Sequence, residues 1–418
     1  MECNNIITRL LGIKGWEVKG LSIEDRKGTE SVIVDLGRTE REHTCSKCGD
    51  KVDKAYTYKE QEARHLLWWS YPTYLRFTKY RVKCHRCGKK VEKLNWLKWY
   101  GRVTNGLASL VGELCKVMTV EAVALLLYLH RGTVKELDKR AIKEAQKNRS
   151  LEGITALGVD EMAVGKGHKY WHMVHTLDGP NGPELLYIGE GRKEKDLKGF
   201  WRWFGKRRAK KIFYAVMDMW KGFEKSFKAN CPKVKIIYDK FHIVRHLLNA
   251  LNEVRKAEFR IANKQMKGHL IGKKFILLSR MENLMGDARK ALKQLLRVNR
   301  RLYKAYLLKE SFGQLWSYTS KTWAMKFWNN WKEQLKWSRL TPYKKFAKMI
   351  DRHMDGILSY CEVKLPLGYI EAANLKAKNI IRRAYGYRDK EYMKLKIIQG
   401  CSSLGGFNPW NTPSNIPS

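Results

Sequence analysis

The sequence predicts a mixed α/β core that follows a small β-rich module and precedes a long all-helical segment. Between residues 153 and 241, apolar runs of strand length alternate with helical patterns in the order βββαβαβ. Residues 13 to 100 contain short alternating segments that are typical of strands, whereas residues 243 to 360 show no strand pattern. With 418 residues, the chain is expected to form several domains rather than one.

The charge of the chain predicts a polyanionic partner. Lys and Arg together number 83 against 41 Asp and Glu, and the net charge of +42 is spread over the whole length. Such a charge repels itself in a compact protein, so nucleic acid is the first expected partner and an anionic membrane surface the second. No apolar run approaches the roughly 20 residues of a membrane span, and no secretory signal is visible, so we expect a cytoplasmic protein without structural disulfides.

The β-rich module contains two close pairs of cysteines. Cys45 and Cys48 form one pair, Cys84 and Cys87 form the other, and each pair is followed directly by glycine. A gap of two residues lets both sulfurs of a pair reach one ion, and the glycine permits the turn. Four thiolates fill a tetrahedral site and leave no position open for water. The sequence therefore predicts a structural Zn²⁺ site. Strands are expected at residues 17–22, 31–35, 71–77 and 81–83.

Residues 105 to 147 change to a helical pattern that fits a helix-turn-helix. A helix from 120 to 127, a tight break at 128–130 and a second helix opened by Thr133 are expected. A second helix of this kind can enter the major groove and read the edges of the bases. The candidate DNA contacts on it or at its edge are Arg131, Thr133, Lys135 and Arg140.

Two carboxylates occupy informative positions in the α/β core. Asp160 interrupts the apolar run of the first strand, and Asp218 ends the fourth strand. The predicted order places these strands side by side, so the two carboxylates would lie close together. Such carboxylates repel each other unless a divalent cation lies between them, which points to Mg²⁺ or Mn²⁺. Asp239, at the end of the fifth strand, is the main competitor of Asp218, although its strand is the less direct neighbour of the first.

A third acidic ligand is expected on a helix that follows the long helical segment. Glu371 lies there in an apolar setting before two alanines, but spacing alone does not distinguish it from Glu362. Basic residues follow Glu371 where a DNA backbone would pass, namely Lys376, Lys378, Arg382 and Arg383.

The all-helical segment is strongly basic. Between Arg245 and Lys348 it contains 25 Lys or Arg and six Asp or Glu, an imbalance that favours nearby phosphate. Aromatic and aliphatic side chains also recur every fourth residue, at Trp323, Phe327, Trp331 and Leu335. We interpret this stripe as the buried face of a helix rather than as a surface for stacking bases.

Five features stand together in this sequence: the cysteine pairs, the Gly158-Val159-Asp160-Glu161 strand, Asp218, the Tyr238-Asp239-Lys240-Phe241-His242 strand end, and the block from Glu371 to Arg388. This combination resembles the ISL-three family of insertion-sequence transposases, over roughly residues 40 to 395. The resemblance implies a ribonuclease-H-like catalytic core with an all-α insertion, preceded by the β-rich zinc module and the helix-turn-helix. The sequence departs from the family pattern in one place, where Leu375 occupies the position at which a second Asn is expected.

The resemblance implies a role for each acidic residue. Asp160, Asp218 and Glu371 would form the catalytic triad that holds two Mg²⁺ or Mn²⁺ ions, and His242 would contact the scissile phosphate or support a metal ligand. The expected domains are a zinc module (1–100), a helix-turn-helix (101–150), the first part of the core (151–242), the helical insertion (243–365), the last core helix (366–398) and a disordered tail (399–418).

The implied function is transposition of DNA. The enzyme would hydrolyse phosphodiesters at the ends of an insertion sequence, and the freed 3′ hydroxyls would attack target DNA. Joining two ends implies a homodimer or a larger assembly on double-stranded DNA. Two alternatives remain open: a metal-dependent nuclease or Holliday-junction resolvase of the same fold, which cuts without joining, and a catalytically inactive DNA-binding regulator, which would not need the three acidic residues together.

Overall fold

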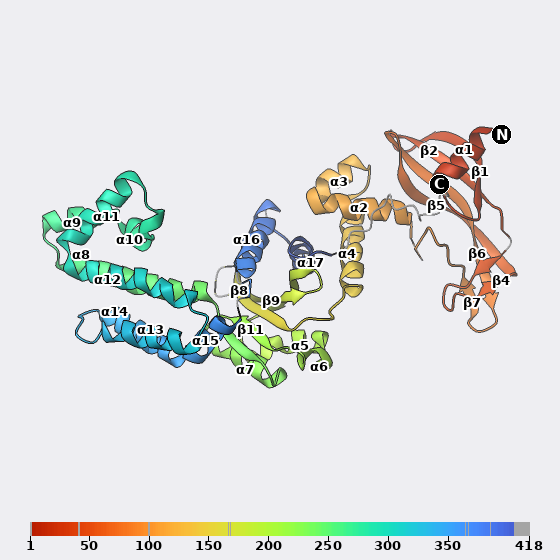
Figure 1. Ribbon diagram of the computed structural model, residues 1–418. Coiled ribbons are helices and arrows are strands. Elements are labelled where there is room, and N and C mark those ends of the chain that lie inside the picture. Colours follow the sequence, from red (N-terminus) through yellow and green to blue (C-terminus); the bar gives the residue numbers. More distant parts are fainter. Residues whose placement is uncertain are drawn as a thin grey trace. The chain divides into compact units, whose positions relative to one another are not determined.

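The computed structural model describes residues 2–40, 42–98, 101–165, 167, 169–363, 365–366, 368–384 and 386–404. The chain divides into two compact units (Figure 1). Unit 1 combines Met1–Arg149 with Arg383–Gly400 and the chain end from Leu404, and unit 2 combines Ser150–Arg382 with Cys401–Ser403. Both units therefore contain segments from distant parts of the sequence.

A five-stranded sheet forms the N-terminal part of unit 1, as the β-rich pattern predicts. Its strands run in the order β1-β2-β6-β5, with β7 paired to β6, and only the β2–β6 pair is parallel. The elements are α1 (Glu2–Leu11), β1 (Trp16–Asp25), β2 (Glu30–Arg38), β5 (Ala55–Trp68), β6 (Tyr71–Cys84) and β7 (Gly88–Val91). The two strands expected at 71–77 and 81–83 are one continuous strand, β6. Strand β5 was not predicted, because the first half of it is exposed and polar and has no apolar alternation.

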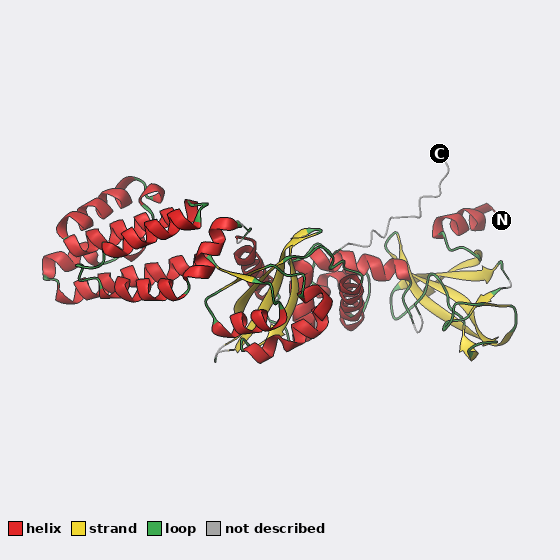
Figure 2. Cartoon of the chain, turned by 60° about the horizontal axis from the view of Figure 1, so that its bottom comes forward, coloured by secondary structure: helices red, strands yellow, loops and turns green. Residues whose placement is uncertain are grey.

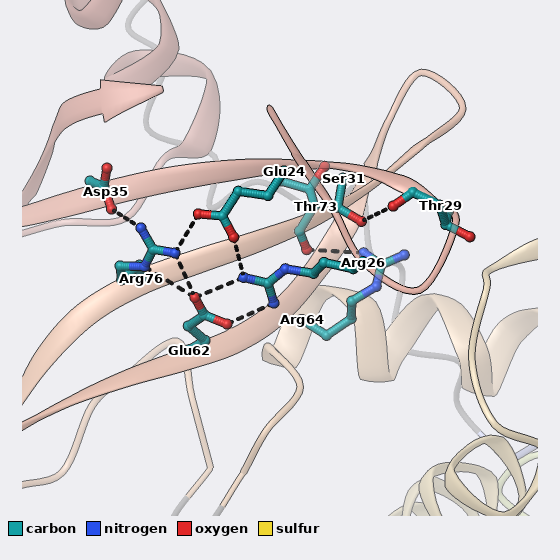
Figure 3. Close-up of polar contacts among 9 residues, drawn as sticks. All are labelled: Glu24, Arg26, Thr29, Ser31, Asp35, Glu62, Arg64, Thr73 and Arg76. Atoms are coloured by element: carbon teal, nitrogen blue, oxygen red, sulfur yellow. Dashed lines mark hydrogen bonds and ion pairs between the residues drawn. The ribbon is translucent and has the colours of Figure 1, made fainter. Parts of the chain in front are cut away.

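One region of this sheet carries a network of arginine and carboxylate side chains (Figure 3). Arg26 donates to Glu62 at 2.7 Å and to Glu24 at 3.0 Å, and Arg76 donates to Glu24 at 2.8 Å. The hydrogen bond from Arg76 lowers the pKa of Glu24, with Arg26 adding to the effect. Because these bonds join β1, β5 and β6, they favour one register of the strands over slipped alternatives.

The helical part of unit 1 contains the expected pair of helices, but the second begins earlier than predicted. The elements are α2 (Asn105–Val117), α3 (Val120–Leu126), α4 (Arg131–Lys147) and, from the far end of the chain, α17 (Lys390–Gly400). Helix α4 begins at Arg131 rather than at Thr133, because the side chain of His130 accepts a hydrogen bond from the amide of Gly132 and caps the helix. The break before it includes Tyr128, whose φ is 52°.

The sheet of unit 2 has the predicted order of elements and the predicted neighbours. Its strands are β8 (Ala156–Gly165), β9 (Lys169–Gly179), β10 (Gly182–Glu190), β11 (Tyr214–Met217) and β12 (Lys235–Tyr238). They lie in the order β10-β9-β8-β11-β12, with β8, β9 and β10 antiparallel and β11 parallel to both β8 and β12. Strand β11 therefore joins the first strand to the last, as the sequence pattern predicts.

Helices cover both faces of this sheet (Figure 2). On one face, α5 (Lys198–Phe204) and α7 (Lys221–Asn230) bury Phe200, Phe204, Phe223 and Phe227 in the largest core of the protein. On the other face, α16 (Gly368–Arg383) packs through Ile370 in a smaller cluster with strand residues. The alternate side chains of the buried strands point to these two cores.

Between β12 and α16 the described residues form helices and no strand, as the sequence predicts. The α-helices are α8 (Lys240–Ile261), α9 (Lys264–Leu270), α10 (Lys274–Leu278), α11 (Gly286–Val298), α12 (Arg300–Phe312), α13 (Lys321–Glu333), α14 (Thr341–Arg352) and α15 (Met354–Glu362). Their core includes the stacked rings of Trp328 and Trp331, whose centroids lie 5.2 Å apart.

The predicted buried stripe of this segment is only partly correct. Trp331 and Leu335 are buried and Phe327 is half-buried, but Trp323 is 59% exposed and Trp328 is buried in the core instead. A helix turns by about 100° per residue, so positions four apart drift by about 40° at each step. Over three steps the stripe therefore leaves the buried face. Leu335 also lies beyond the end of α13 at Glu333.

The C-terminal segment also differs from expectation. Two helices, α16 and α17, occupy residues for which a single last core helix was expected; α16 ends at Arg383, and Gly386 adopts φ 104°, which interrupts the helix. Residues 399–404, which were expected to belong to a disordered tail, are partly held in place, because the carbonyl of Cys401 accepts hydrogen bonds from Leu185 and Tyr369. Residues 405–418 of that tail lie outside the described residues. Within the described part, no helix has the length and apolar composition needed to cross a bilayer.

Candidate active site and zinc centre

The four predicted zinc ligands lie together in unit 1. Cys45 and Cys48 flank a turn closed by Gly49, whose φ is 82°, while Cys84 ends β6 and Cys87 precedes Gly88, whose φ is 68°. The sulfur atoms of Cys45, Cys48, Cys84 and Cys87 all lie within 4.8 Å of one another. A closed set of four thiolates is the donor set of a structural zinc ion, so the predicted clustering is confirmed.

The local backbone prepares one of these thiols for a metal. The amides of Cys48 and Lys47 point at the sulfur of Cys45 and lower its pKa to about 6. A thiolate is therefore favoured at this position near neutral pH, and the thiolate is the form that binds zinc. The turn residues thus lower the pKa of this thiol as well as fixing its position.

In unit 2, the register of the sheet brings Asp160 and Asp218 to neighbouring positions. Val159 of β8 pairs with Met217 of β11, so the next residue on each parallel strand is one of the two aspartates. Each carboxylate also accepts a hydrogen bond from the amide that follows it, at 2.7 Å for Asp160 and 2.6 Å for Asp218. Burial raises the pKa of Asp160, and the charges of Asp239 and Asp218 raise it further against the opposing effect of His242.

Asp239 and His242 belong to the same cluster. Asp239 follows β12, caps α8 by accepting the amide hydrogen of Phe241 at 3.0 Å, and lies 3.1 Å from the Nδ1 atom of His242. Burial lowers the pKa of His242, but the bond to Asp239 and the charges of Asp218 and Asp160 outweigh burial and raise the pKa to about 9. A cationic histidine therefore stands among three carboxylates. As the strand order predicts, β12 pairs with β11 and not with β8.

Helix α16, which carries Glu371, contacts this cluster through two of its neighbouring residues. Ile370 packs closely on Gly158 of β8, and the amide group of Asn374 donates a hydrogen bond to Asp160. Residues three apart share one face of a helix, so the exposed Glu371 lies on the same side of α16 as Asn374. Among the described residues, only the four cysteines form a group of three or more whose ligand atoms all lie within 4.8 Å of one another. The carboxylate oxygens of Asp160, Asp218 and Glu371 are therefore farther apart than this as a set of three.

Sequence reasoning missed one residue in this region and left a second, Glu362, as a competitor. Asn374 received no role, yet it binds Asp160 directly, and its position three residues after Glu371 was the signal that could have identified it. Glu362, the competitor of Glu371, forms ion pairs with Lys321 at 2.9 Å and with Lys235 at 3.4 Å. Lys235 begins β12, whereas Asp239 follows the other end of that strand, so Glu362 lies away from the carboxylate cluster.

The predicted DNA contacts in α4 fall into two groups. Arg131 and Arg140 are exposed, and Thr133 is half-buried. Lys135 instead forms an ion pair with Asp389 at 2.8 Å, and its ammonium lies 5.7 Å from the ring of Tyr392 in α17. The charge of Lys135 is therefore engaged within unit 1. On α16, the predicted contacts are all exposed, namely Lys376, Lys378, Arg382 and Arg383.

The contact between α4 and α17 was not foreseen from the sequence. Asp138, in the middle of α4, is fully buried and accepts hydrogen bonds from the Tyr392 hydroxyl at 2.5 Å and from the Lys396 ammonium at 3.0 Å. Lys139 adds ion pairs to Asp389 and Glu391. The C-terminal helix is thus an integral part of the unit that contains the helix-turn-helix.

A four-cysteine zinc centre on a basic β-module, together with carboxylates at adjoining strand ends, is the arrangement of a metal-dependent enzyme that acts on nucleic acid. Comparison with known proteins makes this class specific. Residues 157–397 match the model of the ISL3-type DDE transposases, described as "Transposase", and residues 41–87 match the zinc-finger of transposase IS204/IS1001/IS1096/IS1165. The two matches cover the carboxylate cluster and the cysteine cluster.

Relatives of similar length support the same assignment. The chain is 31% identical to the transposase for insertion sequence element IS1001 of Bordetella parapertussis, over 94% of this chain and 97% of the relative. It is 23% identical to the transposase for insertion sequence element IS1557 of Mycobacterium tuberculosis, over 87% and 86%. The chain therefore belongs to the ISL3 family of DDE transposases, as the resemblance of its motifs implies. Membership of this family implies DNA binding and a divalent metal ion.

Proposed function

We propose that this transposase cuts DNA at the ends of an insertion sequence and joins the freed 3′ ends to a target. We further propose that unit 2 has a ribonuclease-H-like core in which Asp160, Asp218 and Glu371 hold two Mg²⁺ or Mn²⁺ ions. The strand order β10-β9-β8-β11-β12, with one antiparallel half and one parallel half, supports this core. The relatives named for IS1001 and IS1557 support the insertion-sequence substrate.

One observation carries the assignment of the site. Asp160 lies in β8, and Asp218 directly follows the adjacent parallel strand β11. Helix α16 contacts this pair through the hydrogen bond that Asn374 donates to Asp160. That helix carries Glu371 on the same side as Asn374. These contacts support the proposal that three acidic residues separated by long stretches of sequence form one site in unit 2.

The donor set fits divalent magnesium or manganese. Its atoms are carboxylate oxygens, which hard cations prefer, and the mutual repulsion of Asp160, Asp218 and Asp239 calls for a compensating positive charge. The Oδ1 atom of Asn374 is buried beside Asp160 without a hydrogen-bond partner. Held by Asp160, Asp218 and Glu371, such ions would supply the Lewis-acid chemistry that an in-line displacement at phosphorus needs.

The protein's own residues supply position and charge. Asn374 holds one oxygen of Asp160, and the amide of Glu161 holds the other, so the carboxylate has a defined orientation. His242, kept cationic by Asp239, is placed to contact the scissile phosphate or to support a metal ligand. The exposed basic side chains of α16 and of its C-terminal end are available to the DNA backbone: Lys376, Lys378, Arg382 and Arg383.

Because displacement at phosphorus does not depend on the base, the ends must be recognised outside the carboxylate site. We assign this recognition to the zinc module and to α4, where Arg131 and Arg140 are exposed. Transfer of two ends in one reaction requires two active sites, so we propose a homodimer or larger assembly on DNA.

Replacement of the acidic residues by their amides tests the catalytic assignment. We expect Asp160→Asn, Asp218→Asn and Glu371→Gln to reduce strand cleavage by about 100-fold or more, because each removes a carboxylate proposed to hold the ions that would stabilise the transition state. Glu362→Gln is the matched control and should cleave normally, since Glu362 pairs with two lysines elsewhere. Normal cleavage by Asp218→Asn would refute the assignment.

A second measurement separates the competing functions. With substrates labelled at the 3′ end, a transposase produces joined products, whereas a nuclease or resolvase produces only cut ones. A regulator would bind the DNA and yield neither product. Joined products that disappear in Asp160→Asn, with DNA affinity unchanged, support the proposed reaction.

A further inference from the structure

The helical segment of unit 2 contains an open groove of about 560 Å³ between α13 and α15. Met325 and Leu358 contribute its apolar surface, and Lys321, Lys326, Asn329 and Asn330 contribute polar groups. Among the described residues, no acidic side chain lines the groove, and α13 contains none from Lys321 to Lys332. The groove therefore combines positive charge with amide groups that can both donate and accept hydrogen bonds.

An exposed indole stands beside this groove. Trp323 is 59% exposed, and the ammonium of Lys326 lies 5.0 Å from its ring centroid. Positions 323, 326 and 330 share one side of the helix, because residues three, four and seven apart lie above one another. The opposite side of α13 buries Ala324, Trp328 and Trp331 in the core. Since those residues already anchor the helix, the exposed indole is not needed for packing.

The charges around the groove are only partly neutralised. Glu362 is shared between Lys321 and Lys235, so one carboxylate serves two ammonium groups. Lys332 pairs with Asp351. Lys326 has no ion pair among the residues that the structure describes. An anionic ligand that also offers a flat aromatic surface would complement a free ammonium beside an exposed indole.

We propose that the α13–α15 groove binds DNA with unpaired bases, with a base stacked on Trp323 and a phosphate held by Lys326. A duplex hides the faces of its bases, whereas an unpaired strand exposes them to an aromatic side chain. Asn329 and Asn330 then reach the edges or sugars of the neighbouring nucleotides. The proposal rests on the proposed function in that DNA is the substrate, but it assigns a second contact outside the carboxylate cluster.

The fold connects this groove firmly to the strand next to the candidate active site. Leu358 of α15 lines the groove, and Gly356 of the same helix lies so close to the ring of Tyr238 in β12 that an added Cβ would come within 2.5 Å. Tyr238 directly precedes Asp239. Lys235 shares Glu362 with the groove residue Lys321. It lies four residues before Asp239 along an extended strand, which is a distance of roughly 13 Å.

Binding of labelled oligonucleotides to the full chain tests the groove. Fluorescence anisotropy would be measured with a single strand of mixed sequence and with the same sequence as a duplex, without added divalent ions. We expect Trp323→Ala to weaken single-strand binding by about 5- to 150-fold and duplex binding much less, because stacking on one base is lost. Trp323→Phe should retain most of the affinity. For Lys326→Ala, the slope of the logarithm of the binding constant against the logarithm of the salt concentration should become shallower by roughly 0.7, because one phosphate contact is lost.

Matched controls come from the same helical segment. Trp337→Ala removes an indole that is 88% exposed and lies outside the groove, and Lys290→Ala removes an exposed lysine. Both should bind as the unmodified protein does, and melting curves would show that all variants are folded. Unchanged single-strand binding by Trp323→Ala would overturn the proposal. So would an equal loss in Trp337→Ala, or equal losses on duplex and single strand.

The result is separable from the catalytic assignment. Asp160→Asn should bind the single strand normally, since the groove does not include the carboxylates. If Trp323→Ala bound normally while Asp218→Asn still abolished cleavage, the groove proposal would fail and the proposed function would stand.

Discussion

The close contact between Gly158 and Ile370 predicts that a single methyl group will disturb the candidate active site. A Cβ at Gly158 would lie 2.6 Å from Cδ1 and 3.3 Å from Cγ1 of Ile370, and 3.5 Å from Cδ2 of Leu177. Carbon atoms in contact normally stay about 3.5–4.0 Å apart, so Gly158→Ala forces a movement of roughly 1 Å. Ile370 is buried in α16 and has little room to yield.

The expected effects of Gly158→Ala on stability and on cleavage follow from overpacking and from the position of α16. Inserting a carbon into a packed core costs about 1–3 kcal/mol, so the free energy of unfolding of unit 2 should fall by that amount. The same movement shifts Asn374 and Glu371, because they lie on the displaced helix. A misplacement of about 1 Å in a catalytic site reduces the rate by about 100-fold. We therefore expect cleavage to fall much further than stability.

Urea unfolding and strand cleavage would be measured for a double-mutant cycle. Ile370→Val removes the clashing Cδ1 atom and by itself costs about 0.5–1.5 kcal/mol. The double variant should be more stable and more active than the sum of the single changes predicts. Gly268→Ala is the control, because an added Cβ there meets nothing within 4 Å, and alanine should stabilise its helix slightly. Additive effects, or normal cleavage by Gly158→Ala, would refute the reasoning.

Three further predictions concern metal, charge and pH. Cys84→Ser should abolish the zinc content measured with a colorimetric chelator and weaken DNA binding, whereas Cys231→Ser, which alters a buried cysteine of unit 2, should retain zinc. Asp138→Ala leaves the Lys396 ammonium without its anion, so the unfolding transition of unit 1 should lose about 3–5 kcal/mol; an unchanged midpoint in urea would contradict the role of this pair. Burial lowers the pKa of His175 to about 3, and neither ring nitrogen has a hydrogen-bond partner within the described part of the chain. Because the unfolded chain takes up this proton first, stability is full above pH 6.5 and declines as pH falls toward 3. The decline is about 2 kcal/mol by pH 5, and His175→Leu should remove that slope.

Several features followed from the sequence because their causes are local. The spacing within each cysteine pair and the glycine after it determine a metal-binding turn, and the four sulfurs do cluster. The apolar runs of the core predicted its strands. The order of those strands then placed Asp160 next to Asp218, which the β8–β11 register confirms. The motifs also identified the family before any comparison.

Other features depended on which face of an element meets its neighbour. Strand β5 is exposed and polar over half of its length, so no apolar pattern revealed it. The stripe from Trp323 to Leu335 was misjudged because the helix rotates away from the core along that spacing. Lys135 looked like a free DNA contact, but in the structure Asp389, directly before α17, is its partner.

The sequence by itself determined the zinc module, the α/β core and the adjacency of Asp160 and Asp218, since each arises from patterns within a few residues or from the order of strands. Only the tertiary structure decided that Asn374 binds Asp160 across 214 residues and that Lys396 binds Asp138 across 258. Such contacts depend on how helices pack on a sheet or on one another. Packing is determined by the shapes of both partners, and a linear pattern records only one of them at a time.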